Sequence, residues 1–205
     1  MRVDMYLYSN TIFMHNPRVY ALHVCMYRWG KLPITIYPKN YTSAMDAADA
    51  GIANYEFAKG LGRSHRYYTE KPLYPFGFGL SYTTFAHTCT QQASKQSDSG
   101  LSFMCIIENT GTVAGDEVLL VYHSVGDQIR KTIGDAHPVP FKDLCEFTRV
   151  SLPAGKKVQV EFTLDTQQAA TITTQDGSQK LYPGQHAFIF SRGQPEHDQV
   201  ITVDL

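Results

Sequence analysis

The side chains best suited to acid–base chemistry in this chain are carboxylates at three places. Asp116 and Glu117 are adjacent, Asp46 and Asp49 stand three residues apart, and Glu70 precedes a lysine. General acid–base hydrolysis needs two such groups directed at one reacting bond. Adjacent residues of a strand point to opposite faces, and charged residues three apart on a helix indicate a solvated helix surface. We therefore assign none of these carboxylates a catalytic role.

Motifs for other chemistries are missing as well. The sequence has no Gly-x-Ser-x-Gly turn for a serine nucleophile, and its eight histidines never occur at His-x-His or His-x-x-x-His spacing. Gly77-Phe78-Gly79 lacks the lysine and the following helix of a phosphate-binding loop. The sequence thus indicates no catalytic, cofactor-binding or metal-binding residue, and no cofactor is expected.

The four cysteines, Cys25, Cys89, Cys105 and Cys145, are widely spaced and form no Cys-x-x-Cys pair, so metal ligation is not expected. Cys105 lies in the apolar run LSFMCII, where a free cysteine acts as a small hydrophobic residue. A disulfide between Cys89 and Cys105 is the alternative, on the condition that both lie on neighbouring strands. The free cysteine is the favoured assignment.

Composition bounds the class of protein and its partners. The chain has 205 residues, 43% of them hydrophobic and 18% charged, which is typical of a soluble globular protein of one or two domains. With a net charge of −1, the chain lacks the excess of basic residues that is typical of proteins that bind nucleic acids or anionic membranes. No apolar run approaches the roughly 18 residues of a membrane span. We expect neither a nucleic-acid partner nor a membrane.

The N-terminal segment gives little information about structure or localisation. Residues 1–29 have no clear hydrophobic period, and Asp4 interrupts their start, so a signal peptide is not expected and the localisation is left open. Asn40-Tyr41-Thr42 is an N-glycosylation sequon, which has meaning only in a secreted protein.

The elements that would position any site are mostly strands. In Lys157–Leu164, valine, phenylalanine and leucine alternate with polar residues, the pattern of a half-buried strand. Turn residues separate seven or eight such segments, which predicts an antiparallel immunoglobulin-like sandwich. The predicted strands are Leu80–Thr88, Leu101–Glu108, Glu117–Ser124, Leu144–Leu152, Lys157–Leu164, Ala169–Thr174, His186–Ser191 and Gln199–Leu205, with an exposed loop at Gln91–Gly100.

Residues 30–70 are harder to assign. A short edge strand is predicted over Leu32–Tyr37, because β-branched residues there are bounded by prolines. Ser43–Lys59 is rich in helix formers, with Ser43 as a candidate N-cap, but Gly51 and a poor apolar period leave a short helix and an irregular loop equally favoured.

Between these regions lies Lys71–Phe85, which reads KPLYPFGFGLSYTTF. Its prolines disfavour helix and its glycines permit unusual backbone angles, while its aromatic residues supply a large apolar area. This composition predicts an extended, rigid and buried seam between two modules rather than a flexible linker. The seam residues are Tyr74, Phe76, Gly77, Phe78, Gly79 and Tyr82.

This seam resembles the junction that precedes the C-terminal fibronectin type III-like domain of family 3 glycoside hydrolases, the β-glucosidases and β-xylosidases. GKLPITIYP, from Gly30 to Pro38, is similar to a strand near the end of the family's α/β-sandwich domain. NTGTVAGDEVLLVY, from Asn109 to Tyr122, resembles the start of the fibronectin-like domain, which Pro138–Leu164 continues. The resemblance covers roughly residues 30–205, with its motifs in register.

The resemblance implies a glycosidase ancestry and a chain without the catalytic part. Retaining enzymes hold two carboxyl groups about 5 Å apart across the scissile bond. Family 3 enzymes take both from segments upstream of the region matched here, so neither residue can be carried onto this sequence. The implied identity is a C-terminal fragment whose complete enzyme hydrolyses β-glucosides or β-xylosides. A stand-alone carbohydrate-binding or scaffold module is the alternative.

Three residues ahead of the seam are the candidates for contact with a sugar. Arg66 and Tyr68 lie in RSHRYY, which resembles the family's run of an arginine and aromatic residues between domains, although Ser64-His65 departs from the usual pattern. Interdomain packing is the favoured role of Arg66 and Tyr68, and for Glu70 a surface ion pair with Lys71 or Arg66. Contact with a sugar is the alternative for all three.

The predicted organisation follows from these assignments. Residues 1–70 would be a remnant of the α/β-sandwich domain, 71–85 the seam, and 86–205 a fibronectin type III-like sandwich. The expected partners are a β-linked oligosaccharide or polysaccharide, or a catalytic domain supplied by another chain.

Overall fold

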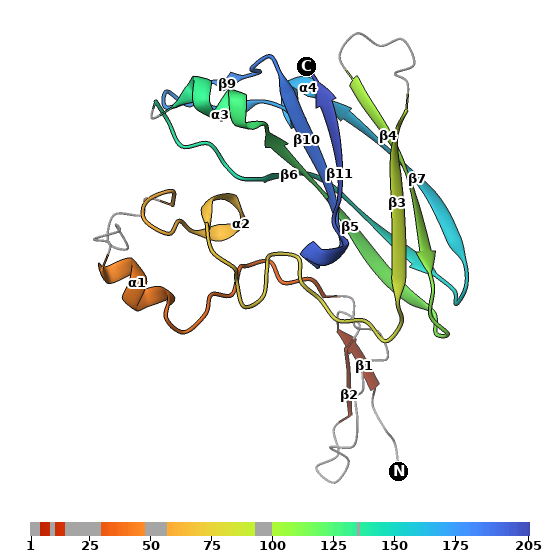
Figure 1. Cartoon of the computed structure of the whole chain (residues 1–205). Helices are drawn as coiled ribbons and strands as arrows, with labels where there is room; N and C mark the ends of the chain where they lie inside the picture. The colour runs from red at the N-terminus through yellow and green to blue at the C-terminus, as the bar shows by residue number, and fades with distance from the viewer. Residues whose placement is uncertain (1–4, 9–10, 15–29, 48–56, 93–99, 135) are drawn as a thin grey trace.

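The computed structural model describes residues 5–8, 11–14, 30–47, 57–92, 100–134 and 136–205 (Figure 1). Two antiparallel sheets face each other, one in the order β11-β10-β5-β6 and the other in the order β3-β4-β7. The predicted mainly β antiparallel sandwich is confirmed. Their strands are β3 Phe85–Gln92, β4 Gly100–Asn109, β5 Gly115–Val125, β6 Asp143–Leu152, β7 Lys157–Asp165, β10 Gln185–Ser191 and β11 Gln199–Asp204.

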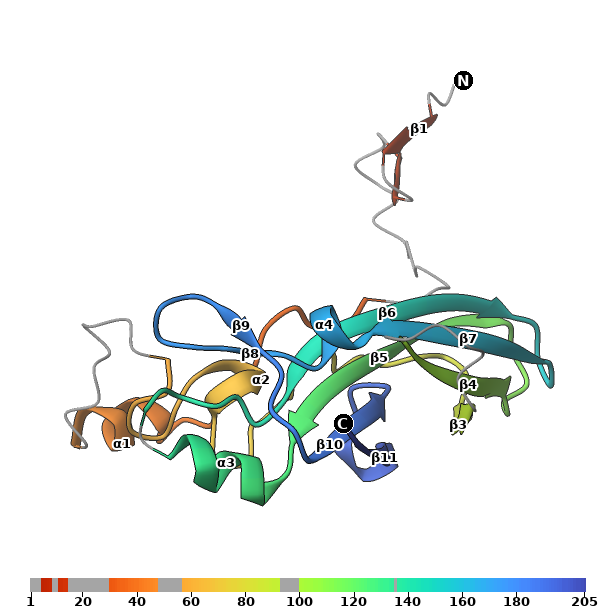
Figure 2. The ribbon, with the colours of Figure 1, turned by 90° about the horizontal axis from the view of Figure 1, so that it is seen from above.

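The sandwich core forms because one face of each sheet carries the apolar half of an alternating pattern. Phe103 on β4 and Phe162 on β7 are paired across their strands, and both are buried. From the other sheet Phe188 and Phe190 place their rings 5.1 and 5.3 Å from that of Phe103. At one edge the sheets approach each other, and β6 lies beside β7 in Figure 2.

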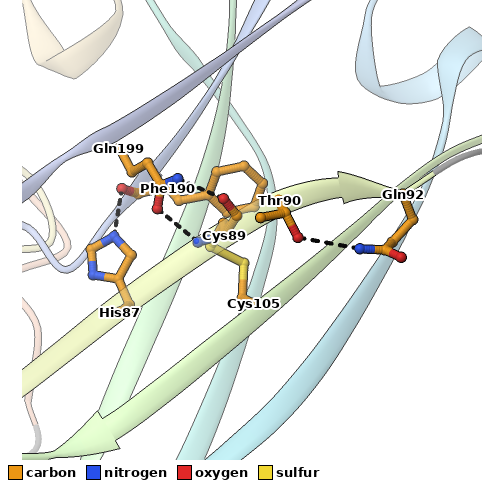
Figure 3. Close-up of a disulfide and its surroundings, with 7 residues drawn as sticks. All are labelled: His87, Cys89, Thr90, Gln92, Cys105, Phe190 and Gln199. Atoms are coloured by element: carbon orange, nitrogen blue, oxygen red, sulfur yellow. Dashed lines mark hydrogen bonds between the residues drawn. A yellow bond between two sulfur atoms is a disulfide. The ribbon is translucent and has the colours of Figure 1, made fainter.

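A disulfide ties two strands of the smaller sheet together. Cys89 on β3 and Cys105 on β4 are direct cross-strand partners, and they form a disulfide inside the core (Figure 3). The favoured assignment of Cys105 as a free cysteine is therefore wrong, and the disulfide given as its alternative is formed. On the side of β3 that faces away from β4, the Cys89 backbone N–H donates a 2.7 Å hydrogen bond to the side-chain oxygen of Gln199 on β11. The Gln199 side-chain nitrogen donates a 2.5 Å hydrogen bond back to the Cys89 carbonyl.

Two segments of the sandwich differ from the sequence-based prediction. The strand predicted at Ala169–Thr174 is wrong over its first part, because the Asp165 carboxylate accepts a hydrogen bond from the Gln167 backbone N–H and starts a one-turn helix, α4, at Thr166–Ala169. Only β8, Ile172–Thr173, remains extended, and it pairs with β9, Gln179–Lys180. The helix α3, Asp127–Ile133, was not anticipated; it buries Ile129 and Ile133.

The first strand of the sandwich also begins later than predicted. β3 starts at Phe85 rather than at Leu80, so the residues between them belong to the seam. The predicted exposed loop at Gln91–Gly100 is shortened, because β3 continues to Gln92 and β4 begins at Gly100; residues 93–99 lie outside the described residues.

Upstream of the sandwich the described elements are short. The strands β1, Met5–Tyr8, and β2, Thr11–Met14, pair with each other in an antiparallel hairpin. The helix α1 covers Tyr41–Ala47 and α2 covers Ser64–Tyr67. Ser43 therefore lies inside α1 and is not its N-cap, and residues 48–56 of the segment Ser43–Lys59 lie outside the described residues. Of the strand predicted over Leu32–Tyr37, a single bridge is formed, between Ile36 and Tyr74. No described helix is long and apolar enough to span a membrane.

Removing the Cys89–Cys105 disulfide should lower the free energy of unfolding by about 3 kcal/mol, because the bond closes a loop of 16 residues in the unfolded chain. The measurement is urea denaturation of a Cys89→Ala/Cys105→Ala double variant. The control is Cys145→Ala, which removes the free cysteine and leaves the disulfide in place. Equal denaturation midpoints for the double variant and the control would contradict the expectation.

Candidate functional site

The seam packs on the outer face of the larger sheet, which explains why β5 is buried on both faces. Leu119 and Val121 point into the sandwich core, while Leu120 and Tyr122 on the opposite face are buried as well. A Cβ atom on Gly77 would lie 2.4 Å from a Leu120 methyl group and 3.5 Å from the Tyr122 hydroxyl. The seam backbone thus lies directly against β5.

Two glycines permit this approach. Gly77 has φ of 81°, and its carbonyl oxygen would be 1.9 Å from a Cβ atom on Gly193, which follows β10 and has φ of 79°. A side chain at Gly193 would collide with backbone that cannot move independently, and positive φ disfavours other residues at both positions. The seam therefore contacts the sandwich backbone to backbone at this point.

Backbone hydrogen bonds join the seam to residues 30–38. The Leu32 N–H donates to the Phe78 carbonyl at 2.9 Å, and the Gly77 N–H donates back to the Leu32 carbonyl at 2.8 Å. Further along, the Ile36 N–H donates to the Tyr74 carbonyl at 2.9 Å. These paired bonds hold the upstream segment alongside the seam as one unit.

A buried ion network fixes this unit to the sandwich. Lys31 Nζ lies 2.7 Å from Oε1 of Glu117, and Arg192 Nη1 lies 3.7 Å from Oε2 of the same carboxylate. Lys31 also donates a 2.8 Å hydrogen bond to the Arg192 carbonyl. The Glu117 and Arg192 side chains are only 8% and 10% exposed, so solvent screens these charges weakly. The three residues come from three separate parts of the chain.

The ion network borders a cavity of about 590 Å³ between the seam and the sandwich. Its other polar lining residues include His87 and His197. The His87 Nε2 atom lies 3.1 Å from the Phe190 carbonyl, and burial lowers the pKa of this histidine (Figure 3). The cavity is therefore lined by polar and charged groups, most of them engaged with partners inside the protein.

The adjacent carboxylates bind separate cations. Asp116 forms an ion pair with Arg149 on β6, whereas Glu117 binds Lys31 and Arg192. Hydrogen bonds from Ser151 and Arg149, which outweigh the effect of burial, lower the pKa of Asp116. Each carboxylate thus neutralises a nearby cation, which is a structural role.

The arginine and aromatic residues before the seam are partly buried and contact other residues of the chain. Tyr68 meets the rings of Tyr37 and Tyr41 edge-on at 4.9 and 5.5 Å, and those two rings stack at 4.1 Å. Arg66 Nη2 lies 2.8 Å from the Asp143 carboxylate at the start of β6. The partner of Arg66 is therefore Asp143, which the sequence did not indicate, while Glu70 is exposed.

His65 connects the seam to the sheet. Its ring lies 4.4 Å from that of Phe76 and 5.8 Å from that of Tyr122. Burial and the positive charge of Lys142 lower the pKa of His65 to about 4, so the imidazole is neutral near pH 7. The Lys142 ammonium lies 4.5 Å from the centroid of the Tyr122 ring, a cation–π contact that covers the sheet from the β6 side.

Several large apolar side chains of this unit are exposed. The prediction of a buried seam is wrong for Tyr74 and Tyr82, which are 43% and 50% exposed. Phe76 and Phe78 are partly buried, as expected of residues that contact the sandwich. Five such residues of the upstream segment and the seam, which we call together the apolar face, are each 43% to 59% exposed: Ile34, Leu73, Tyr74, Leu80 and Tyr82.

Comparison with known proteins identifies the architecture. Residues 117–193 match the fibronectin type III-like domain family. An exo-1,4-β-xylosidase from Emericella nidulans is 35% identical over 176 residues, which cover 78% of this chain and 22% of that protein. The chain belongs to glycoside hydrolase family 3. The β-glucosidase B of the same organism is 30% identical over 173 residues, 82% of this chain and 19% of that protein.

Solved structures agree with this membership in family 3. A β-glucosidase from Listeria innocua in complex with glucose is 27% identical, with a TM-score of 0.54 over 68% of this chain and 19% of that one. A β-glucosidase involved in saponin metabolism from intestinal bacteria has 25% identity and a TM-score of 0.56, covering 70% and 19% of the two chains. The chain therefore spans about a fifth of the length of the family 3 relatives it matches.

The Glu117→Gln substitution should lower the free energy of unfolding by about 3–5 kcal/mol, because it leaves two cations buried without their counter-ion. Urea denaturation of this family 3 chain measures the loss. Glu108→Gln is the matched control, since Glu108 lies 4.0 Å from Lys157 in an exposed pair that is worth at most about 1 kcal/mol. Similar losses for the two variants would contradict the network's role.

The stability of the chain should fall as the pH decreases from about 6.5 to about 4. In this window the unfolded chain protonates His65, whereas burial keeps the residue neutral in the folded chain. Burial also lowers the pKa of His123 to about 4, so it adds to the same loss. Denaturation midpoints should therefore depend less steeply on pH in a His65→Gln variant. The exposed His197→Gln control should keep the original slope, and an unchanged slope in His65→Gln would contradict this assignment.

Proposed function

We propose that this chain is the noncatalytic C-terminal part of a family 3 glycosidase whose complete form hydrolyses O-glycosyl bonds of β-glucosides or β-xylosides. Its role would be to hold and stabilise the catalytic part. The observation that carries this proposal is the exposure of five large apolar side chains, the apolar face, on a segment that the Lys31–Glu117 ion pair joins to the fibronectin type III-like sandwich. Exposed apolar side chains that gather in a patch are typical of an interface.

The carboxylates of the described residues support a noncatalytic role. A retaining glycosidase needs two carboxyl groups about 5 Å apart with room for a sugar between them. Asp116 and Glu117 are instead each bound to a cation from another part of the chain. The proposal therefore places catalysis in segments that correspond to the remaining length of the relatives, and it assigns this chain to their support.

The purified 205-residue chain should release no p-nitrophenol from aryl β-glucosides or β-xylosides, because the adjacent carboxylates among its described residues, Asp116 and Glu117, are bound to cations rather than directed at one bond. A chimera tests the supporting role: residues 30–205 replace the matching stretch of the Emericella nidulans xylosidase. The chimera should keep the activity on aryl β-xyloside that a truncated xylosidase loses, with the intact xylosidase as reference. Hydrolysis by the isolated chain, or a folded chimera no more active than the truncated enzyme, would contradict the proposal.

The isolated chain should self-associate through its apolar face, and a Leu73→Ser/Leu80→Ser variant should shift it towards the monomer. Burying each leucine contributes about 1.5–3 kcal/mol, so association should weaken by at least tenfold. Size-exclusion chromatography over a concentration series measures the shift. Ile106→Ser is the control, because Ile106 is an exposed apolar residue on the outer face of the other sheet. A wild-type chain that elutes as a monomer at every concentration would contradict the prediction.

One observation favours a second candidate, a carbohydrate-binding module. Tyr74 and Tyr82 expose 43% and 50% of their surface, and exposed aromatic rings of this kind are suited to contact with the apolar faces of sugar rings. Depletion of the chain from solution by insoluble glucan or xylan tests this candidate. A Tyr74→Ser/Tyr82→Ser variant should then remain in solution.

A further inference from the structure

We propose that Asn40 carries an N-linked glycan. Asn40-Tyr41-Thr42 is the one Asn-x-Ser/Thr sequence in the 205 residues, and its middle residue is not proline. A sequon alone does not establish modification, since many are never presented to the transferase or would be buried on folding. Two independent features of the structure support this one: the way the three residues are presented, and the disulfide in the sandwich.

The sequon is presented with its two acceptor-defining residues outward. Asn40 and Thr42 are exposed, whereas the intervening Tyr41 turns inward. The Tyr41 ring stacks on that of Tyr37 at 4.1 Å, and its hydroxyl donates a 2.9 Å hydrogen bond to the Gly62 carbonyl. The folded chain can therefore accommodate a bulky group on Asn40 without losing these contacts.

The site also lies away from the sandwich. Asn40 immediately precedes α1, and in both Figure 1 and Figure 2 α2 lies between α1 and the sandwich strands β5 and β6. The Asn40 carbonyl, rather than its side chain, accepts the hydrogen bond that begins the helix, from the Ala44 N–H at 3.1 Å. Modification of the side-chain amide would leave this bond intact.

The disulfide indicates that the chain folds in an oxidising compartment. Cys89 and Cys105 are cross-strand partners whose sulfur atoms are bonded within the core. Disulfides of this structural kind form and persist in oxidising compartments, such as the lumen of the endoplasmic reticulum, and are rare in a reducing cytosol. The same lumen is where sequons meet oligosaccharide donors. The disulfide and the sequon thus both indicate passage of the chain through the lumen of the endoplasmic reticulum.

The proposed step is a group transfer from a lipid-linked oligosaccharyl diphosphate. A bond forms between Asn40 Nδ2 and C1 of the first N-acetylhexosamine. The bond between that C1 and the diphosphate oxygen breaks, and the lipid diphosphate leaves with the electron pair. The amide nitrogen loses one proton to a base of the transferase, so charge and atoms balance without a redox partner.

The test is expression of the full 205-residue chain behind a secretory leader in yeast. We expect a slower band on denaturing gels that peptide-N-glycosidase converts to the unmodified mobility. Because Asn40 is exposed in the folded chain, the enzyme should act without prior denaturation. The tryptic peptide from Asn40 to Lys59 should then contain aspartate at position 40, which mass spectrometry detects; Asn54 in the same peptide should remain asparagine.

Matched variants separate the sequon from nearby changes. Asn40→Gln and Thr42→Ala should abolish the slower band, whereas Thr42→Ser, which keeps the sequon, and Ser43→Ala, which lies just outside it, should retain it. These bands report on modification whether or not a variant folds well, because sequons are modified as the chain enters the lumen. A secreted chain with an intact Cys89–Cys105 disulfide and an unmodified Asn40 would overturn the proposal, as would a slower band that persists in Asn40→Gln.

Discussion

The arrangement of this chain depends on the Glu117 carboxylate, which binds one cation from before the seam and one from after β10. Lys31 and Arg192 are 161 residues apart, and they meet at this one acidic group. Burying three charges carries a large desolvation cost, which direct pairing and the hydrogen bond from Lys31 offset only when the geometry is held closely. The network therefore favours one position of the upstream segment on the sandwich over all others.

The glycine contact acts together with this network. Gly77 and Gly193 let two backbones touch, and the same approach buries Leu120 and Tyr122 on the outer face of β5. A sandwich strand normally leaves one face to solvent, so the double burial of β5 makes the seam part of the folding unit. The residues of the apolar face thereby belong to a segment that is packed against the fibronectin type III-like domain, which suits the supporting role proposed above.

Local sequence patterns predicted most strands of the sandwich, but they could not predict which residues pair over long distances in the chain. The alternation in Lys157–Leu164 set the strand and its buried face correctly, because burial of one face imposes a period of two. Ala169–Thr174 was misassigned because its β-branched residues favour a strand, whereas the Asp165 cap favours a helical turn. The pairs Lys31–Glu117 and Arg66–Asp143 join residues 86 and 77 positions apart. No spacing in the sequence could reveal either pair, since only the fold brings them together.

The amide of Gln199 has a consequence for how this sandwich meets other chains. β3 ends the smaller sheet, and the outward N–H and C=O of Cys89 would be free to accept an extra strand from a peptide or a second molecule. The planar side-chain amide of Gln199 satisfies both hydrogen bonds, as the peptide unit of a neighbouring strand would. Growth of the sheet by strand addition is therefore blocked at this position of β3.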